Sequence, residues 1–284
     1  MDMVKLKIKD LIIDCKALIF DKDGTLTIFE SLWIPLIKKR AYFVALEAGE
    51  NHEFEEMLLE NWGINPKTLK IDPRGPCPVS PRNEEIVIGT AAMYRKGYLW
   101  DMAKKIVMHA FDKADSEMDL TLTVKPVKKL KENLYRFKKA GLLLAVATSD
   151  ERKDTEKILS HWNVLGLFDT MVCSGEVTKS KPHPEILFEI CKRLKINPNE
   201  AIFLGDTIND MITGKKAKMA LNIGVTEGGV VPKEELEKFA DIVIGSLSEI
   251  EIINKKIFKE NFQKKGLTQK RKLNNFFIKR KEAF

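Results

Sequence analysis

Six short apolar segments, separated by stretches with helical periodicity, constrain the fold of this 284-residue chain more than any other feature. Each segment has the length and composition of a buried strand, and the stretches between them carry apolar residues at helical spacing. Such alternation is typical of a parallel sheet covered by helices on both faces. The sequence therefore predicts an α/β fold with a doubly wound parallel sheet. The predicted strands are Ala17–Phe20, Leu142–Thr148, Met171–Cys173, Ala201–Gly205, Ala220–Val225 and Asp241–Ile244.

The stretch between the first two predicted strands is too long for a single crossover. Apolar residues recur there at helical spacing, which indicates a separate helical unit. The first of them are Leu32, Leu36, Ile37, Ala41 and Val44. We therefore predict a discontinuous core at residues 1–28 and 121–250, a helical insert at 29–120 and a tail at 251–284. The alternating residues Val4–Asp14 are expected to add an edge strand or a hairpin to the core.

Two carboxylates, Asp21 and Asp23, follow directly after the first predicted strand and precede Gly24. Two anions so close together are costly unless a cation or a shared proton separates their roles. The pattern suits covalent phosphoryl transfer, in which Asp21 attacks phosphorus, Asp23 handles the proton and a magnesium ion neutralises the charge. A solvated turn rich in aspartate explains the same residues. This motif alone does not decide between the two interpretations.

Three later segments also place polar residues at or after the ends of apolar runs. The strand in Gly141–Asp150 ends in Thr148 and Ser149. A proline-stiffened loop carries Lys181, and the strand Ala201–Gly205 ends in an acidic pair. Ligands bind beyond the carboxyl ends of the strands in an open parallel sheet. Together the segments favour the catalytic interpretation.

In order along the chain, these four segments resemble the haloacid dehalogenase superfamily of phosphotransferases, from about Lys16 to about Ser246. The subgroup most resembled is the phosphoglycolate phosphatase-like one. The resemblance implies a Rossmann-like core with an inserted α-helical cap. It also implies an Mg²⁺-dependent phosphatase that hydrolyses a small-molecule phosphate monoester, phosphoglycolate-like or a sugar phosphate, through an aspartyl phosphate.

The resemblance also implies roles for the four aspartates. The Asp21 carboxylate, the Asp23 main-chain carbonyl and Asp206 would bind the metal. Asp23 would act as general acid and then as general base. Asp210 would orient a metal-bound water or a nearby lysine, although an acid early in a helix is also favoured by the helix dipole alone.

Three further residues are expected to contact the transferring phosphoryl group. Thr148 and Ser149 would donate hydrogen bonds to it, although a helix N-cap explains the same residue types. Lys181 would place a positive charge on a phosphoryl oxygen or on the Asp21 carboxylate. Lys179 lies two residues away, and the pairing of a lysine with proline favours Lys181.

The presence of Asp23 argues against the dehalogenating, phosphonate-cleaving and transport ATPase members of the superfamily. A phosphatase and a phosphomutase of the beta-phosphoglucomutase type remain. Lys22 departs from the resembled pattern, in which a large apolar residue is frequent. The substrate is expected to be chosen by the cap, because lid closure completes such sites. Cap residues able to recognise anions or rings are Trp33, Arg40, Arg74, Arg82, Tyr94 and Arg95.

The net charge of +7 is concentrated in the tail, where residues 255–284 carry eleven basic and two acidic side chains, a net charge of +9. Lysines interleaved with phenylalanines can bind nucleic acid or an anionic membrane, so a binding protein that uses this tail is an alternative function. A solvated tail is the other interpretation. The chain has no apolar run of the roughly 20 residues that a membrane span needs, and we expect a cytoplasmic location.

Overall fold

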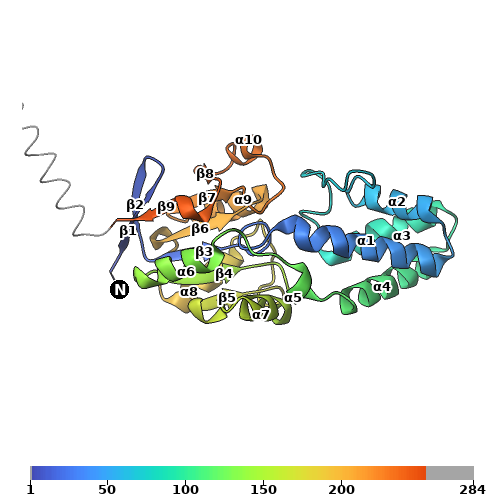
Figure 1. Cartoon of the computed structure of the whole chain (residues 1–284), viewed down its shortest axis with the longest axis horizontal. Helices are drawn as coiled ribbons and strands as arrows, with labels where there is room; N and C mark the ends of the chain where they lie inside the picture. Colours follow the sequence, from blue (N-terminus) through green and yellow to red (C-terminus); the bar gives the residue numbers. More distant parts are fainter. Residues whose placement is uncertain (1, 254–284) are drawn as a thin grey trace, which may run out of the picture.

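The computed structural model describes residues 2–253 and has two parts (Figure 1). The strands gather at one end of the molecule, and helices α1–α4 lie together at the other. Six strands form one sheet with the order β5-β4-β3-β6-β7-β8 and parallel pairing throughout. They are β3 (Ala17–Phe20), β4 (Leu143–Ala147), β5 (Thr170–Val172), β6 (Ala201–Gly205), β7 (Leu221–Val225) and β8 (Ile242–Ile244).

This sheet confirms the predicted fold class and all six predicted strands. From β3 the chain adds β4 and β5 on one side, and then returns to add β6 on the other side of β3. The strand order therefore reverses between β3 and β6. In open parallel sheets this switch point is where ligands bind.

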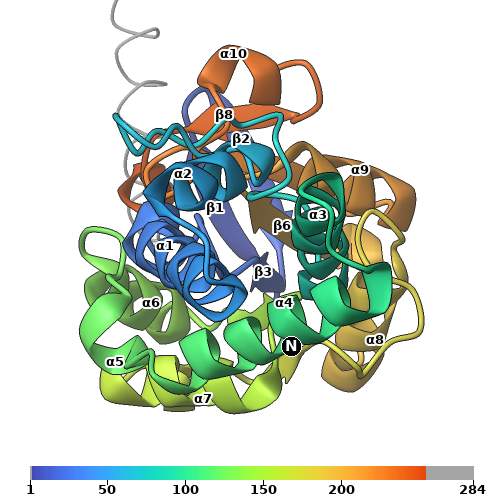
Figure 2. The same cartoon turned by 90° about the vertical axis from the view of Figure 1, so that its right-hand side faces the viewer.

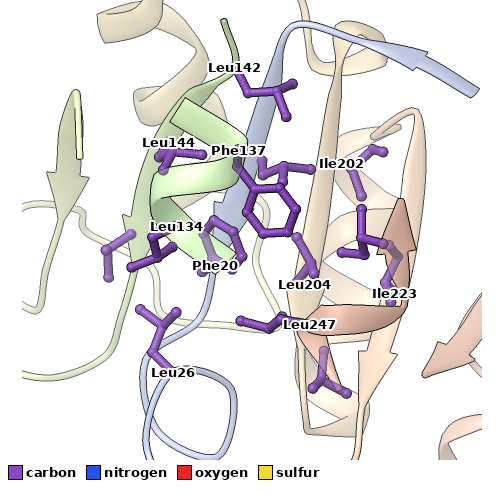
Figure 3. Close-up of a cluster of buried hydrophobic side chains, with 14 of the residues drawn as sticks. Phe20, Leu26, Leu134, Phe137, Leu142, Leu144, Ile202, Leu204, Ile223 and Leu247 are labelled. Carbon is purple, nitrogen blue, oxygen red and sulfur yellow. The ribbon is translucent and has the colours of Figure 1, made fainter. Parts of the chain in front are cut away.

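Alternate residues of the central strands enter two separate cores, because strand side chains point to opposite faces in turn. On one face, Leu18 and Phe20 of β3 pack with Phe137 (Figure 3). On the other, Ala17 and Ile19 pack in a second cluster of buried side chains. Burial on both faces explains why the strand sequences are continuously apolar.

Helices supply the partners for both faces. α6 packs against β4 in the first cluster, whereas α8 and α9 cover the opposite face. The helices that alternate with the core strands are α6 (Leu130–Lys139), α7 (Arg152–His161), α8 (Glu185–Leu194), α9 (Ile208–Ala217) and α10 (Lys233–Leu236).

The predicted N-terminal hairpin forms, but it does not extend the edge of the main sheet. β1 (Val4–Ile8) pairs antiparallel with β2 (Leu11–Cys15) and with β9 (Ile250–Ile252), which makes a separate three-stranded sheet. Leu6 and Ile8 of β1 are fully buried and join the first core cluster. Strand pairing continues through Ile252, beyond the expected start of the tail at 251.

The helical part between β3 and β4 has a hydrophobic core of its own, which contains Trp62 and Phe111 in edge-to-face contact. Figure 2 views the molecule from this end. Its helices are α1 (Phe29–Ala48), α2 (His52–Asn61), α3 (Arg82–Arg95) and α4 (Trp100–Ser116), followed by the short α5 (Leu120–Thr123). The limits of the predicted cap at 29–120 stay a prediction.

Two antiparallel chain segments connect the helical part to the core. The Val127 amide donates to the Leu26 carbonyl, and the Ile28 amide donates to the Lys125 carbonyl. Thr27 and Pro126 form an isolated antiparallel bridge between these hydrogen bonds. The connection into α1 therefore begins only a few residues after the loop that carries Asp21 and Asp23.

Two of the predicted cap arginines are occupied by contacts within the cap. Arg40 is 4% exposed, forms a 2.6 Å ion pair with Glu85 and lies over the Phe111 ring. Burial raises the pKa of Glu85 to about 7 despite this partner. Arg82 forms ion pairs with Asp112 and Asp115. Both arginines therefore have structural partners of their own.

None of the helices within residues 2–253 combines the length and apolar content that a membrane span requires. The predicted polyanion-binding tail, residues 255–284, lies outside the described residues. The cytoplasmic location stays a prediction.

We expect Arg40→Ala to lower the free energy of unfolding by about 3–5 kcal/mol, because it leaves the Glu85 carboxylate buried without its partner. The double variant Arg40→Met/Glu85→Met removes both charges and should recover most of that loss. Urea unfolding monitored by circular dichroism measures both. A stable Arg40→Ala protein with altered selectivity among anionic ligands would instead favour the recognition role predicted from the sequence.

Candidate active site

The chain turns sharply after β3, and this turn brings the first two aspartates to the carboxyl edge of the sheet. The Lys22 carbonyl accepts hydrogen bonds from the amides of Thr25, Leu26 and Thr27. Gly24 has a φ of 78°, and a Cβ there would lie 2.0 Å from Asp206 Oδ2. Only glycine fits this close approach, so Gly24 allows the first loop to touch the loop after β6.

Lys181 reaches the same edge and bridges two carboxylates. Its Nζ donates to Asp21 Oδ1 at 2.5 Å and to Asp210 Oδ1 at 2.7 Å. The pKa of Lys181 is raised by these two anions, which outweigh its burial. Lys179 is exposed, and its amide donates to Glu185. The geometry therefore favours Lys181, as the sequence predicted.

Asp210 contacts Lys181 and also caps the start of α9. It is the third residue of α9, where the Thr207 hydroxyl donates to its Oδ2 and accepts from its amide in a capping box. Its other oxygen, Oδ1, accepts from Lys181. The cap fixes the side-chain orientation that brings Asp210 to the lysine.

A group of three buried carboxylates is suited to a divalent cation. Asp21, Asp206 and Asp210 each offer an oxygen atom, and these atoms lie within 4.8 Å of one another. Asp206 Oδ2 is buried without a hydrogen-bond partner, and burial with the neighbouring anions raises the pKa of Asp206 well above its ordinary value. Oxygen ligands of this kind suit Mg²⁺. The residues therefore fit the expected metal.

Two of the expected ligands, Asp21 and Asp206, belong to this group, and the Asp210 carboxylate lies with them. The expected contribution of the Asp23 main-chain carbonyl stays a prediction. Thr25 donates a long hydrogen bond to Asp206 Oδ1, 3.4 Å, which leaves Oδ2 as the unpartnered atom. The metal-binding and catalytic roles stay predictions.

Asp23 lies beside this cluster with two donors on one oxygen. Its Oδ1 accepts from Lys22 Nζ at 2.6 Å and from the Thr27 hydroxyl at 3.0 Å. Burial is the largest cause that raises the pKa of Asp23, to about 6, and the Asp150 carboxylate adds to the shift. A carboxyl group in that range can exchange a proton near neutral pH.

Thr148 and Ser149 follow β4, which pairs with β3 in register. Thr148 is 2% exposed and its hydroxyl accepts from the Asp150 amide, whereas Ser149 is exposed. The N-cap of α7 is Glu151, so neither residue caps that helix. The helix-cap explanation of this pair is therefore wrong, and phosphoryl contact stays a prediction.

Sequence reasoning missed the loop that follows β7. A Cβ on Gly229 would lie 2.6 Å from Asp206 Cβ, and the Gly228 carbonyl accepts from the Phe29 amide at the start of α1. This loop therefore packs against both Asp206 and the entry to the cap. The pair of glycines soon after an apolar strand was the available signal.

The other predicted cap residues are dispersed. Trp33 stacks on Phe29 in the first turns of α1, next to the core. Arg74 has a 90% exposed side chain, and Tyr94 is exposed beside Trp100. Arg95 is also exposed. Their roles in selectivity stay predictions.

Comparison with protein families matches residues 15–218 to the haloacid dehalogenase-like hydrolases. A phosphoglycolate phosphatase of Psychrobacter arcticus is 30% identical over 50% of this chain and 66% of its own length. Hexitol phosphatase B of Escherichia coli is 28% identical over 43% of this chain and 54% of its length. An N-acetylmuramic acid 6-phosphate phosphatase of Pseudomonas aeruginosa is 33% identical over 33% of this chain and 41% of its own length. The chain thus spans less than two thirds of each of these relatives.

Solved structures share the fold over most of the chain. One is described as a "predicted phosphoglycolate phosphatase" from Haemophilus somnus, with a TM-score of 0.63, 21% identity, and coverage of 83% of this chain and 96% of that one. A second is a HAD-superfamily hydrolase of subfamily IA from Geobacter sulfurreducens, with a TM-score of 0.55 and 18% identity. The match covers 83% of this chain and 94% of that one. These likenesses support the architecture of core and helical part together.

We expect Mg²⁺ to raise the melting temperature more at about pH 8 than at about pH 5.5. The metal-free site raises the pKa of Asp21 to about 7, above its value in the unfolded chain. The metal-free fold therefore loses stability as the pH rises from the pKa of Asp21 in the unfolded chain to its pKa of about 7 in the folded chain. At lower pH, protons compete with the cation for the carboxylates.

Differential scanning fluorimetry with and without Mg²⁺ at each pH measures the two increments, so other titrating groups cancel. Asp206→Asn should reduce the increment at pH 8, because it removes a ligand oxygen. Equal increments at both pH values would contradict a metal site built from these carboxylates.

Proposed function

Because the chain belongs to the haloacid dehalogenase-like hydrolases, we propose that it is a magnesium-dependent phosphatase for a small-molecule phosphate monoester. The observation that carries this proposal is the contact of Lys181 with Asp21, beside a carboxylate group suited to a cation. The nucleophile, its counter-charge and the metal ligands then occupy one edge of the sheet. Phosphoryl transfer depends mainly on such positioning and charge neutralisation.

In the first half-reaction, an Asp21 oxygen attacks phosphorus and the bond from phosphorus to the ester oxygen breaks. Lys181 occupies Oδ1, so the other oxygen, Oδ2, is the one we assign to the attack. Thr148 and Ser149 donate to the phosphoryl oxygens from the end of β4. Bound Mg²⁺ supplies positive charge where the negative charge of the transferring group develops.

Asp23 moves the proton in both half-reactions. It first gives a proton to the departing ester oxygen, which leaves as an alcohol. It then takes a proton from the water that attacks the phosphorus of the aspartyl phosphate, which releases inorganic phosphate and restores Asp21. The raised pKa of Asp23, about 6, allows both transfers near neutral pH.

The relatives favour small organic phosphates as the substrate class. Their names specify phosphoglycolate, hexitol phosphates and N-acetylmuramic acid 6-phosphate. These esters share a phosphate monoester on a small polar alcohol. A phosphomutase uses the same core chemistry, and no contact within residues 2–253 favours transfer to a second substrate over transfer to water.

Asp21→Asn should lower p-nitrophenyl phosphate turnover by at least about a thousandfold, because loss of a covalent nucleophile removes both half-reactions. Lys181→Met should also cause a large loss, since it removes the contact to Asp21. Lys179→Met is the matched control and should retain activity. Substantial turnover by Asp21→Asn would show that the nucleophile is another residue.

A panel of phosphate esters distinguishes hydrolysis from transfer. With phosphoglycolate, hexitol phosphates and sugar phosphates we expect stoichiometric release of free phosphate from the preferred ester. Coupled phosphate detection and mass analysis of the products measure this. An isomeric sugar phosphate formed without free phosphate would assign the chain to the mutases instead.

A further inference from the structure

The side chain of Lys22 has no exposed surface, although it carries a charge. Lys22 follows the proposed nucleophile Asp21 in the sequence, and the proposed mechanism assigns it no role. Its Nζ donates to Asp23 Oδ1 at 2.6 Å and forms a 2.8 Å ion pair with Asp150 Oδ2. Asp23 Oδ1 also accepts from Thr27, which lies on the connection to the cap. Four side chains thus form one continuous chain of contacts.

A buried ammonium group is costly, and an apolar side chain of similar volume often replaces a buried ion pair without loss of stability. Lys22 is therefore poorly explained as a means of stabilising the fold. Its contacts instead determine how the Asp23 carboxyl group is oriented, because Lys22 holds one particular oxygen of that group. Both donors meet at Oδ1, so Oδ2 is the oxygen left to carry a proton.

Asp150 gives Lys22 a second anchor on a different strand. It follows β4, its amide donates to the Thr148 hydroxyl and its carbonyl accepts from the Ser174 amide. Lys22 therefore connects the loop after β3 to the loop after β4. The Lys22 ammonium group also offsets the repulsion between the carboxylates of Asp23 and Asp150, which both contact it.

We propose that Lys22 is a positioning residue that holds Asp23 Oδ1 between Lys22 and Thr27, so that Oδ2 delivers the proton to the leaving oxygen. This inference rests on the proposed phosphatase function. In that step the bond from phosphorus to the ester oxygen breaks, its electron pair stays on that oxygen, and the proton of Asp23 Oδ2 moves to it. Asp150 holds the lysine in place.

The dependence on the leaving group tests this role. An alkyl phosphate releases a strongly basic alkoxide that requires the proton, whereas p-nitrophenolate leaves as a stable anion. We expect Lys22→Met to slow single-turnover alcohol release from an alkyl phosphate by about tenfold or more, within the range ascribed to general acid catalysis. Release of p-nitrophenol should change much less. Enzyme in excess restricts the measurement to the first half-reaction.

A double-mutant cycle with Asp23→Asn separates positioning from a general structural effect. If Lys22 acts through Asp23, then Lys22→Met should cause no further loss of alcohol release in the Asp23→Asn background. Lys16→Met is the matched control, because Lys16 also forms an ion pair, with Glu200, but lies at the opposite end of β3. It should leave the ratio between the two substrates unchanged.

Equal losses on both substrates, or a full additional loss in the Asp23→Asn background, would overturn the inference. If Lys22→Met does not unfold cooperatively, Lys22→Met/Asp150→Asn removes the uncompensated carboxylate and takes its place. Native selectivity in that double variant would likewise overturn it, since lysine would then serve only to neutralise charge. A native chain that hydrolyses neither ester would instead contradict the phosphatase function itself.

Discussion

Charge balance among buried and half-buried carboxylates is the constraint on which this structure depends. Five aspartates meet at one edge of the parallel sheet: Asp21, Asp23, Asp150, Asp206 and Asp210. Lys22 and Lys181 form ion pairs with all of them except Asp206. Fully ionised, the group carries three more negative than positive charges. Burial and mutual repulsion raise the pKa values of Asp21, Asp23 and Asp206. Such a site is suited to bind a divalent cation and to keep a proton.

The fold brings these charges together from the ends of separate strands, and the connection to the helical unit starts at the same edge. Asp21 follows β3 and Asp206 follows β6, on the two sides of the point where the strand order reverses. The first loop touches Asp206 through Gly24 and touches the cap connection through Thr27. In the cap, Arg40 and Arg82 form ion pairs with other cap residues. The charged side chains that we assign to catalysis therefore follow the strands of the sheet.

The strands were predictable because burial on both faces leaves a continuous apolar run that the sequence displays. The contact of Lys181 with the first loop also followed from motif order. The three-stranded sheet escaped prediction because β9 is short and pairs with a strand at the other end of the chain. The Lys22 contacts escaped it because a lysine between two aspartates has no periodic signal, and its second partner, Asp150, comes from another strand. The ion pair of Arg40 with Glu85 also escaped prediction, because the sequence does not reveal which partner a cap residue meets.

Identification of the phosphorylated residue tests the central claim most directly. Native protein is mixed with a reactive phosphate ester and Mg²⁺, quenched in acid within one turnover, and treated with hydroxylamine to convert any acyl phosphate to a stable hydroxamate. Peptide mass spectrometry then locates the change. The account predicts modification of Asp21 and none in Asp21→Asn. Modification of Asp23 or another residue, or phosphate release with no modified aspartate at any time, would contradict it.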